Sequence, residues 1–326
     1  MPGGTAPSRP ARPPAGSGPA RTLQSRNAPT MSRAETPADL PRLPARVAAS
    51  SKRDYGRVTI IGGAAGMAGA PALAAMAALR SGAGLVELLV PENVCPVAAG
   101  FDPCVMTHGL AAEQGGFAVA AAAGIAPWAA RADALGVGPG IGRTQPVQAI
   151  VLDLWRNLSR PAVFDADALW SLAQVPRERL RIHAGPRVIT PHQGEMMRLL
   201  GRPASADVTR SDLEQAAAEL ASDIGVVVVL KGPGTWIVGD GRSARNETGN
   251  PGMATAGTGD VLTGVVAALL AQGLSAFDAA RLAAWVHGRA GDAAAHDLGQ
   301  VSMTARDLLD RLHVGFLAAV TDRSPA

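Results

Sequence analysis

Short runs of apolar, mostly β-branched residues recur along this chain, and alanine-rich, helix-forming segments separate them. The runs are continuous rather than alternating, which is typical of strands covered on both faces. They lie at residues 58–61, 85–90, 134–137, 162–164, 187–189 and 226–230. This alternation predicts a doubly wound α/β fold, in which helices cover both faces of a mostly parallel sheet.

Predicted helices follow most of these runs. They span residues 71–80, 146–157, 194–200, 211–222, 259–272, 276–295 and 304–320. Near the end the order changes, because residues 234–238 and 243–246, joined by Gly239-Asp240-Gly241, are typical of a β-hairpin. We therefore expect an antiparallel hairpin at one edge of the sheet and a single domain over residues 51–326.

The N-terminal residues 1–50 differ from the rest in composition. They are rich in Pro, Ala, Arg, Gly and Ser without an apolar period, which predicts a disordered extension or a leader upstream of a true start at Met31. Residues 1–57 carry ten Lys or Arg and three Asp or Glu, for +7, and the remainder carries twenty and twenty-four, for −4. The predicted domain is therefore mildly acidic, which argues against nucleic acid as its partner.

Other features bear on the cellular compartment. The uncharged stretch 58–79 is long enough to cross a bilayer, but its glycines and Pro71 divide it into a strand, a loop and a helix. No apolar segment of a secretory signal follows the early arginines. The Arg-rich, acid-poor start resembles an organelle transit peptide in composition, but it lacks the amphipathic helix of such peptides. Cys95 and Cys104 are too few for a disulfide framework. We expect a cytoplasmic protein without a membrane partner.

Glycine-rich loops follow two of the predicted strands, at residues 62–70 and 138–142. In open α/β sheets, ligands bind at the carboxyl ends of the strands, and glycine lets backbone N–H groups approach a ligand closely. A tight turn between strand and helix explains each loop about as well. The spacing excludes the Gly-x-Gly-x-x-Gly dinucleotide motif.

Polar side chains follow two further strands. Asp165 and Asp167 come after the run 162–164, where Asp167 is expected to cap the next helix and Asp165 to play a polar role at the strand end. His192 and Glu195 follow the run 187–189 and lie on a first helical turn. A structural role is the simpler interpretation of both, since an acidic residue favours the helix dipole there.

The clearest functional element spans residues 250–264. Glycines and threonines open a long apolar helix, so unpaired N–H groups predict an anion hole, with Asp260 beside it as a potential general base. Lys231 is one of two lysines in the chain and ends the strand run 226–230 before a Gly-rich turn. Lys231 is a candidate nucleotide contact, or a lysine that remains by chance in a chain whose codon bias favours arginine. A Walker A loop is excluded, because neither lysine follows a glycine.

Taken in order, these residues resemble the bacterial ADP-dependent NAD(P)H-hydrate dehydratases of the ribokinase-like superfamily. The segments that carry the resemblance are residues 56–58 with 62–63, 80–85, 138–142, 165–169, 190–195, 231–235 and 250–264. The Gly-Thr-Gly-Asp element alone specifies the superfamily. Together with Arg-Ser-Gly-Ala-Gly and Thr-Pro-His it is specific to the dehydratases.

The resemblance implies a lyase that repairs nicotinamide cofactors hydrated at C6 of the reduced ring. It implies that ADP phosphorylates the C6 hydroxyl of the S epimer of NADHX or NADPHX. Phosphate then leaves, which yields NADH or NADPH, AMP and phosphate. The resemblance implies ADP as co-substrate and Mg²⁺ as cofactor.

Individual roles also come from the resemblance. Asp260 is implied as the catalytic base and as a contact of the hydrate. The remaining implied roles are an anion hole from Gly257, Thr258 and Gly259; adenine-nucleotide contacts from Lys231, Gly232, Pro233, Gly234, Thr235 and Gly259; a hydrate pocket from Ala70, Gly140 and His192; and Mg²⁺ binding, through water, by Glu195.

Two other functions are considered. A ribokinase-like kinase of a vitamin precursor, of the hydroxymethylpyrimidine or hydroxyethylthiazole type, would use ATP and leave a stable phosphorylated product. A nucleotide-sensing module would not need a base at Asp260. Many relatives carry a fused epimerase domain, which needs more than the 50 residues before this domain, so we expect a separate epimerase. We also expect a homo-oligomer, a tetramer.

Overall fold

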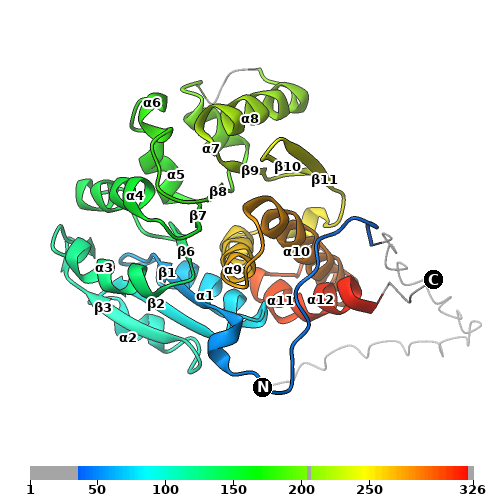
Figure 1. The fold of residues 1–326 in the computed structure, drawn as a ribbon, viewed down its shortest axis with the longest axis horizontal. Helices are drawn as coiled ribbons and strands as arrows, with labels where there is room; N and C mark the ends of the chain where they lie inside the picture. Colours follow the sequence, from blue (N-terminus) through cyan, green and yellow to red (C-terminus); the bar gives the residue numbers. More distant parts are fainter. Residues whose placement is uncertain (1–35, 204–206, 322–326) are drawn as a thin grey trace, which may run out of the picture. The chain divides into compact units, whose positions relative to one another are not determined.

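The computed structural model describes residues 36–203 and 207–321, which cluster as one compact unit. Its sheet has nine strands (Figure 1). In sheet order they are β11 (Arg242–Asn246), β10 (Thr235–Gly239), β9 (Val227–Leu230), β8 (Arg187–Ile189), β7 (Ala162–Phe164), β6 (Ala134–Val137), β1 (Arg57–Ile61), β2 (Leu85–Pro91) and β3 (Met106–Leu110). A separate hairpin joins β4 (Ala112–Glu113) to β5 (Gly116–Phe117).

In sheet order, the seven strands β9, β8, β7, β6, β1, β2 and β3 are parallel to one another. β10 pairs antiparallel with β9, and β11 pairs antiparallel with β10. The predicted mostly parallel sheet with an edge hairpin is therefore confirmed. Strand order reverses at β1, which pairs with β2 on one side and with β6 on the other. Ile61 at the end of β1 pairs with Val137 at the end of β6, so the loops that follow these strands diverge from one point. Such a switch point is where ligands bind in open α/β sheets.

Helices cover both faces of the sheet (Figure 1). The first face carries α1 (Gly69–Arg80), α2 (Cys95–Ala99), α9 (Thr258–Ala271), α10 (Ala276–Leu298), α11 (Ala305–Asp310) and α12 (Leu312–Thr321). The second carries α3 (Ala121–Arg131), α4 (Gln145–Asn157), α5 (Asp167–Leu172), α6 (Arg177–Leu180), α7 (Gln193–Leu199) and α8 (Arg210–Ile224).

Helix α9 lies at the centre of the first face, between α1, α10 and the sheet. Residues 261–270 are all buried, as expected for a helix that is apolar on every side. At Gly264 the backbone of α1 comes so close that a Cβ would lie 2.0 Å from the Ala74 carbonyl oxygen. Close packing therefore fixes α9 with its N-terminus beside the carboxyl ends of the strands.

Part of the fold differs from the expectation. Sequence reasoning assigned no element between residues 91 and 133, where the structure has α2, β3, the β4–β5 hairpin and α3. β3 is an edge strand with an exposed Met106, so it lacks the continuous apolar run of a buried strand, and α3 contains Pro127. The single helix expected over 304–320 is two helices, α11 and α12.

The segment that precedes the sheet packs on the domain. Leu40 is 5% exposed and belongs to the core of the first face. Arg46 donates to the Gly82 carbonyl oxygen at 2.6 Å, and Arg281 of α10 donates to the Asp39 carbonyl oxygen at 2.9 Å. The packed chain therefore begins before the expected boundary at residue 50. The rest of the predicted extension, residues 1–35, lies outside the described residues.

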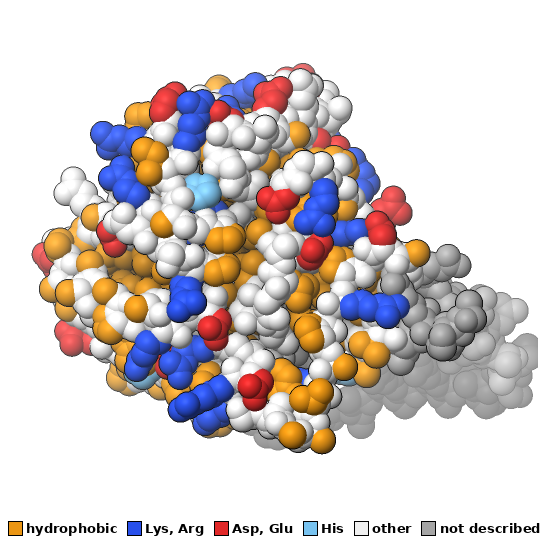
Figure 2. Space-filling view, viewed as in Figure 1, with side chains coloured by type: hydrophobic (Ala, Val, Ile, Leu, Met, Phe, Trp, Pro, Cys, Tyr) orange, Lys and Arg blue, Asp and Glu red, His pale blue; other side chains and the backbone are white. Residues whose placement is uncertain are grey.

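The surface of the described part is mixed in charge. Figure 2 shows basic and acidic side chains interspersed with apolar ones over one face. Across residues 36–203 and 207–321, no helix combines the length and apolarity that a membrane span requires.

Replacing Leu40 by Ala should lower the free energy of unfolding by about 2–3 kcal/mol, because it removes buried methyl groups and leaves a cavity. Urea unfolding measures the change. Val47, which is 65% exposed in the same segment, is the matched control, and Val47→Ala should stay within about 0.5 kcal/mol of the parent. Equal unfolding midpoints for Leu40→Ala and the parent would show that the segment adds nothing to the core.

Candidate active site

The N-terminus of α9 has free backbone donors. Its N-cap residue is Gly257, at φ 91°, and in the described part of the chain no side chain caps the helix. The Thr258 hydroxyl instead donates to the carbonyl oxygens of Met253 (2.9 Å) and Thr255 (3.0 Å), which folds the preceding loop. The first N–H groups of α9 therefore lack an internal partner and favour a bound anion.

Asp260 lies in the first turn of this helix and is partly buried. Burial and the nearby Asp165 carboxylate raise the pKa of Asp260 to about 7, although Lys231 acts in the opposite direction. A carboxyl with this pKa is a base poised near neutral pH. The sequence prediction of a potential base beside an anion hole thus has a physical counterpart in the geometry.

A buried ion pair lies beneath the N-terminus of α9. Lys231, just after β9, places Nζ 2.8 Å from Asp165 Oδ1 and 3.6 Å from Glu195 Oε2. Thr263 donates to the other oxygen of Asp165 at 2.8 Å. Burial lowers the pKa of Lys231, but the carboxylates of Asp165 and Glu195 outweigh it and raise the pKa above its usual value. The expected polar role of Asp165 is confirmed.

His192 and Glu195 form a reciprocal cap at the start of α7. His192 Nδ1 accepts from the N–H groups of Gly194 (3.0 Å) and Glu195 (3.3 Å), while Glu195 Oε2 accepts from the His192 N–H at 2.8 Å. The structural interpretation of both residues therefore holds. The His192 ring also lines a cavity of about 860 Å³, together with Asp165, Lys231 and Asp260.

A second cavity of about 570 Å³ adjoins the first. Its wall includes Lys231 through Thr235, the loop 246–251, and residues of α9 and α10. The two cavities share Thr258 and Gly259 at the start of α9. The predicted nucleotide contacts thus lie together along the smaller cavity. The Lys231 amine turns toward the carboxylates of Asp165 and Glu195.

The two loops at the switch point touch each other. Gly63 donates to the Pro139 carbonyl oxygen at 3.0 Å, and a Cβ at Gly140 would lie 3.2 Å from the Ala70 Cβ. A Cβ at Gly257 would lie 2.7 Å from Leu73 of α1. The structure therefore brings Ala70 and Gly140 together, and α1, which carries Ala70, contacts the start of α9.

The prediction that Asp167 caps α5 is wrong. The N-cap position is Ala166, at φ 51°, and Asp167 is the first residue of the helix. Its carboxylate accepts from the Gly142 N–H at 3.2 Å and from Arg143 Nε at 2.7 Å. Asp167 therefore stabilises the neighbouring glycine loop rather than its own helix.

Sequence reasoning missed a set of contacts from α10. Asp292 accepts from the Gly249 N–H and from Asn250 Nδ2, each at 3.1 Å. His287 Nε2 lies 2.8 Å from the Thr258 carbonyl oxygen. The glycines Gly288 and Gly291 let this loop pack on the backbone of α10, where Cβ atoms would lie 2.1 Å from Thr248 Oγ1 and 2.3 Å from Met253 Sδ. The sequence signal that could have predicted these contacts is the pair of glycines, Gly288 and Gly291, inside a predicted helix, because glycine there often marks a close backbone approach.

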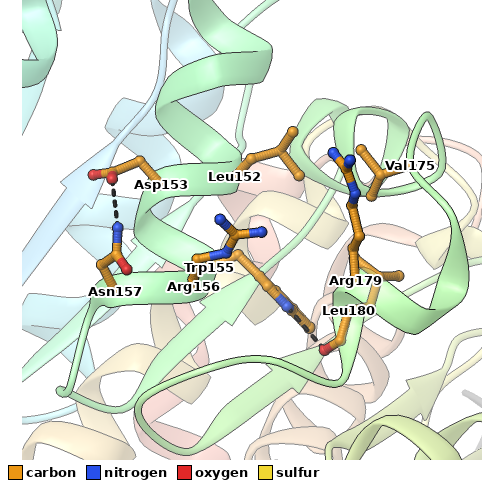
Figure 3. A pocket seen from close by; sticks show the side chains of 8 residues that line it. All are labelled: Leu152, Asp153, Trp155, Arg156, Asn157, Val175, Arg179 and Leu180. Atoms are coloured by element: carbon orange, nitrogen blue, oxygen red, sulfur yellow. Dashed lines mark hydrogen bonds between the residues drawn. The ribbon is translucent and has the colours of Figure 1, made fainter.

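A further hollow of about 270 Å³ lies between α4 and α6 (Figure 3). Its lining includes Arg156, Arg179 and Trp155, whose Nε1 donates to the Leu180 carbonyl oxygen at 3.1 Å. It lies on the second face of the sheet, opposite α9. The candidate site is therefore the pair of cavities at the start of α9.

Comparisons with known proteins show the family of this chain. A family model described as NAD(P)H-hydrate dehydratase matches residues 58–313. The bifunctional NAD(P)H-hydrate repair enzyme Nnr of Moorella thermoacetica is 45% identical over 273 residues, which are 83% of this chain and 51% of that protein. This chain thus spans about half the length of such bifunctional relatives. The ADP-dependent (S)-NAD(P)H-hydrate dehydratase of Neisseria meningitidis is 35% identical over 82% of this chain and 90% of that protein.

Solved structures give the same result. The ADP/ATP-dependent NAD(P)H-hydrate dehydratase of Bacillus subtilis, co-crystallised with ATP/Mg²⁺, superposes with a TM-score of 0.71 at 30% identity, over 84% of this chain and 94% of that one. Ribokinase of Arabidopsis thaliana superposes with a TM-score of 0.52 at 16% identity over 79% of this chain and 98% of that one, which shows the shared fold alone. This chain has a ribokinase-like fold and belongs to the NAD(P)H-hydrate dehydratase family.

Proposed function

We propose that this chain dehydrates the S epimer of NADHX or NADPHX with ADP as phosphoryl donor, and that it forms NAD(P)H, AMP and phosphate. One observation carries the proposal. Asp260, a carboxyl with a pKa of about 7, stands beside the uncapped start of α9 where two cavities meet. The smaller cavity accommodates the nucleotide, and the larger one the hydrate.

In the first step Asp260 takes the proton of the C6 hydroxyl. The hydroxyl oxygen attacks the β-phosphorus of ADP, and the bond between that phosphorus and the bridging oxygen breaks to release AMP. The N–H groups of Gly257, Thr258 and Gly259 stabilise the charge on the transferring phosphoryl group, as preorganised donors do in phosphoryl transfer.

In the second step the C6–O bond breaks. Phosphate leaves with the electron pair, and transfer of a proton from C5 to water restores the ring double bond. Phosphorylation is needed because hydroxide is a poor leaving group and phosphate a good one. The enzyme thus uses a kinase-like site for an elimination.

Magnesium fits this site as an ion held mainly by the nucleotide. Within residues 36–203 and 207–321, no group of three or more His, Cys, Asp or Glu side chains forms a metal cage. Glu195 Oε2 accepts from the His192 N–H, and Glu195 Oε1 lies 3.5 Å from His192 Nε2, which leaves Oε1 able to bind a metal-bound water. This suits Mg²⁺, which keeps several waters and is usually shared with phosphates. When bound, it supplies positive charge to the phosphates of ADP.

Lys231 has an electrostatic role in this proposal. Its ammonium group balances Asp165 and Glu195, which would otherwise repel the phosphates of ADP. The backbone of Gly232 through Thr235 then forms the wall of the nucleotide cavity. Lys231 thus supports nucleotide binding whether or not its amine touches a phosphate.

A vitamin-precursor kinase is less well supported. Hydroxyethylthiazole kinase of Pyrococcus horikoshii superposes with a TM-score of 0.55 at 16% identity, a likeness of fold alone. The dehydratase family model covers most of the domain. The cytoplasmic location, the tetramer and a separate epimerase stay predictions.

The activity itself is tested by incubating the protein with hydrated NADH plus ADP or ATP. The proposal expects recovery of absorbance at 340 nm with ADP, together with equal amounts of AMP and phosphate. A vitamin-precursor kinase would leave the hydrate unchanged. A stable phosphorylated hydrate would contradict the elimination step.

Asp260→Asn should lose at least about 10²-fold in kcat, because the amide cannot take the hydroxyl proton. ADP affinity, measured by calorimetry, and the melting temperature should stay close to those of the parent. Asp153→Asn is a matched control, since that exposed carboxylate lies on α4, on the opposite face of the sheet from α9. Near-normal turnover by Asp260→Asn would remove Asp260 from the mechanism.

The pH dependence follows from the pKa of Asp260. A base acts when deprotonated, so kcat/KM for the hydrate should rise with pH and level off above about 7. Lys231 lowers this pKa, so Lys231→Ala should move the rising limb to higher pH, and Lys231→Arg, which keeps the charge, should move it less. Lys231→Ala should also raise the KM for ADP more than that for the hydrate. Superimposable profiles for Lys231→Ala and the parent would contradict the assigned coupling.

A further inference from the structure

The His287 side chain lies on α10 between the start of α9 and the smaller cavity. It is 9% exposed, and its Nε2 lies 2.8 Å from the Thr258 carbonyl oxygen. A carbonyl oxygen can only accept a hydrogen bond, so Nε2 carries the proton. Burial lowers the pKa of His287 to about 4, although the bond to Thr258 opposes the change, and the ring is therefore neutral at physiological pH. A neutral ring protonated at Nε2 has an acceptor lone pair at Nδ1.

This acceptor faces open space. Within residues 36–203 and 207–321, the interactions found for His287 leave Nδ1 without a hydrogen-bond partner, and Nδ1 is not among the buried unpaired atoms. The open space that His287 borders is the cavity of about 570 Å³ that also contacts Lys231 through Thr235. A hydrogen-bond donor of a molecule in this cavity is therefore the natural partner of Nδ1.

The position of the ring is well fixed. The next residue, Gly288, packs so closely on Thr248 that a Cβ there would lie 2.1 Å from Thr248 Oγ1. Five residues after His287, Asp292 accepts from Gly249 and Asn250 at 3.1 Å each. These contacts tie α10 to one wall of the cavity. The imidazole is therefore preorganised, so binding a ligand costs little side-chain entropy.

The chemistry of ADP limits which part of it can meet Nδ1. At neutral pH its phosphate oxygens are acceptors, which a lone pair repels. Its donors are the two ribose hydroxyls and the amino group of the base, all on the nucleoside. The ring also lies against Thr258, at the start of the helix that receives the phosphates in the proposed function.

We propose that His287 recognises the nucleoside of ADP: Nδ1 accepts a hydrogen bond from a ribose hydroxyl or the base amino group, while Nε2–H holds Thr258 at the anion hole. The inference rests on the proposed function for placing ADP in this cavity. It makes His287 the residue that joins nucleoside recognition to the helix start that binds the phosphates.

Calorimetric titration of ADP into His287→Gln tests this role. The Gln amide nitrogen reaches the place of Nε2 and keeps a donor toward Thr258, but the acceptor at Nδ1 is lost. ADP affinity should fall about three- to tenfold, which is what one neutral hydrogen bond contributes. His296→Gln, an exposed change on the same helix, is the matched control and should bind ADP like the parent.

Three ADP analogues identify the donor. 2′-Deoxy-ADP and 3′-deoxy-ADP each lack one ribose hydroxyl, and inosine diphosphate lacks the amino group. One of them should bind the parent more weakly than ADP, and that difference should disappear in His287→Gln. His287→Asn, which keeps a polar atom near Nδ1 and loses the donor toward Thr258, should keep the difference and lose turnover. His287→Ala replaces His287→Gln if that variant fails to fold, because it also lacks the acceptor at Nδ1.

Equal ADP affinity of the parent and His287→Gln would overturn the inference, as would unchanged discrimination against all three analogues. The two proposals fail separately. If the parent binds ADP through His287 but forms no NADH from the hydrate, the proposed function fails and the inference stands. If the parent dehydrates the hydrate and His287→Gln binds ADP normally, the inference alone fails.

Discussion

The start of α9 is the constraint on which the site depends. Its first N–H groups are uncapped, and the body of the helix is buried on every side between α1, α10 and the sheet. Unpaired donors are unfavourable inside a protein unless a ligand or water pairs with them, and the helix dipole selects an anion. Gly264 against α1 and His287 against Thr258 hold this helix end in place. The fold thus presents a rigid, uncapped helix start, which is the anion hole of the proposed function.

The charges around this hole explain why Asp260 has a pKa near neutrality. Asp165, Glu195 and Asp260 share one buried ammonium group, that of Lys231, which lies closest to Asp165. Because Asp165 takes most of this positive charge, burial and repulsion dominate at Asp260. A single lysine therefore limits how far the pKa of Asp260 rises. In the proposed function the same lysine also lowers the repulsion that ADP meets.

The sequence predicted the features that lie in continuous segments. The parallel sheet, the edge hairpin and the glycine-rich helix start with Asp260 follow from apolar runs and from glycines after strands. The partners of Lys231 could not be predicted, since Asp165 precedes it by 66 residues and their contact depends on strand order. His287 and Asp292 look like any polar residues of a long helix until packing decides which face meets the loop 246–253. Leu40 was missed because one buried leucine in a polar segment has no periodicity.

The account is tested most directly by the fate of the hydroxyl oxygen. Hydrated NADH labelled with ¹⁸O at the C6 hydroxyl is turned over with unlabelled ADP, and the released phosphate is analysed by mass spectrometry. If Asp260 and the anion hole direct phosphoryl transfer to that oxygen, the C6–O bond breaks last and the label appears in phosphate. If the label appears in water, the hydroxyl left without being phosphorylated, and the kinase-like role of the α9 N-terminus is wrong.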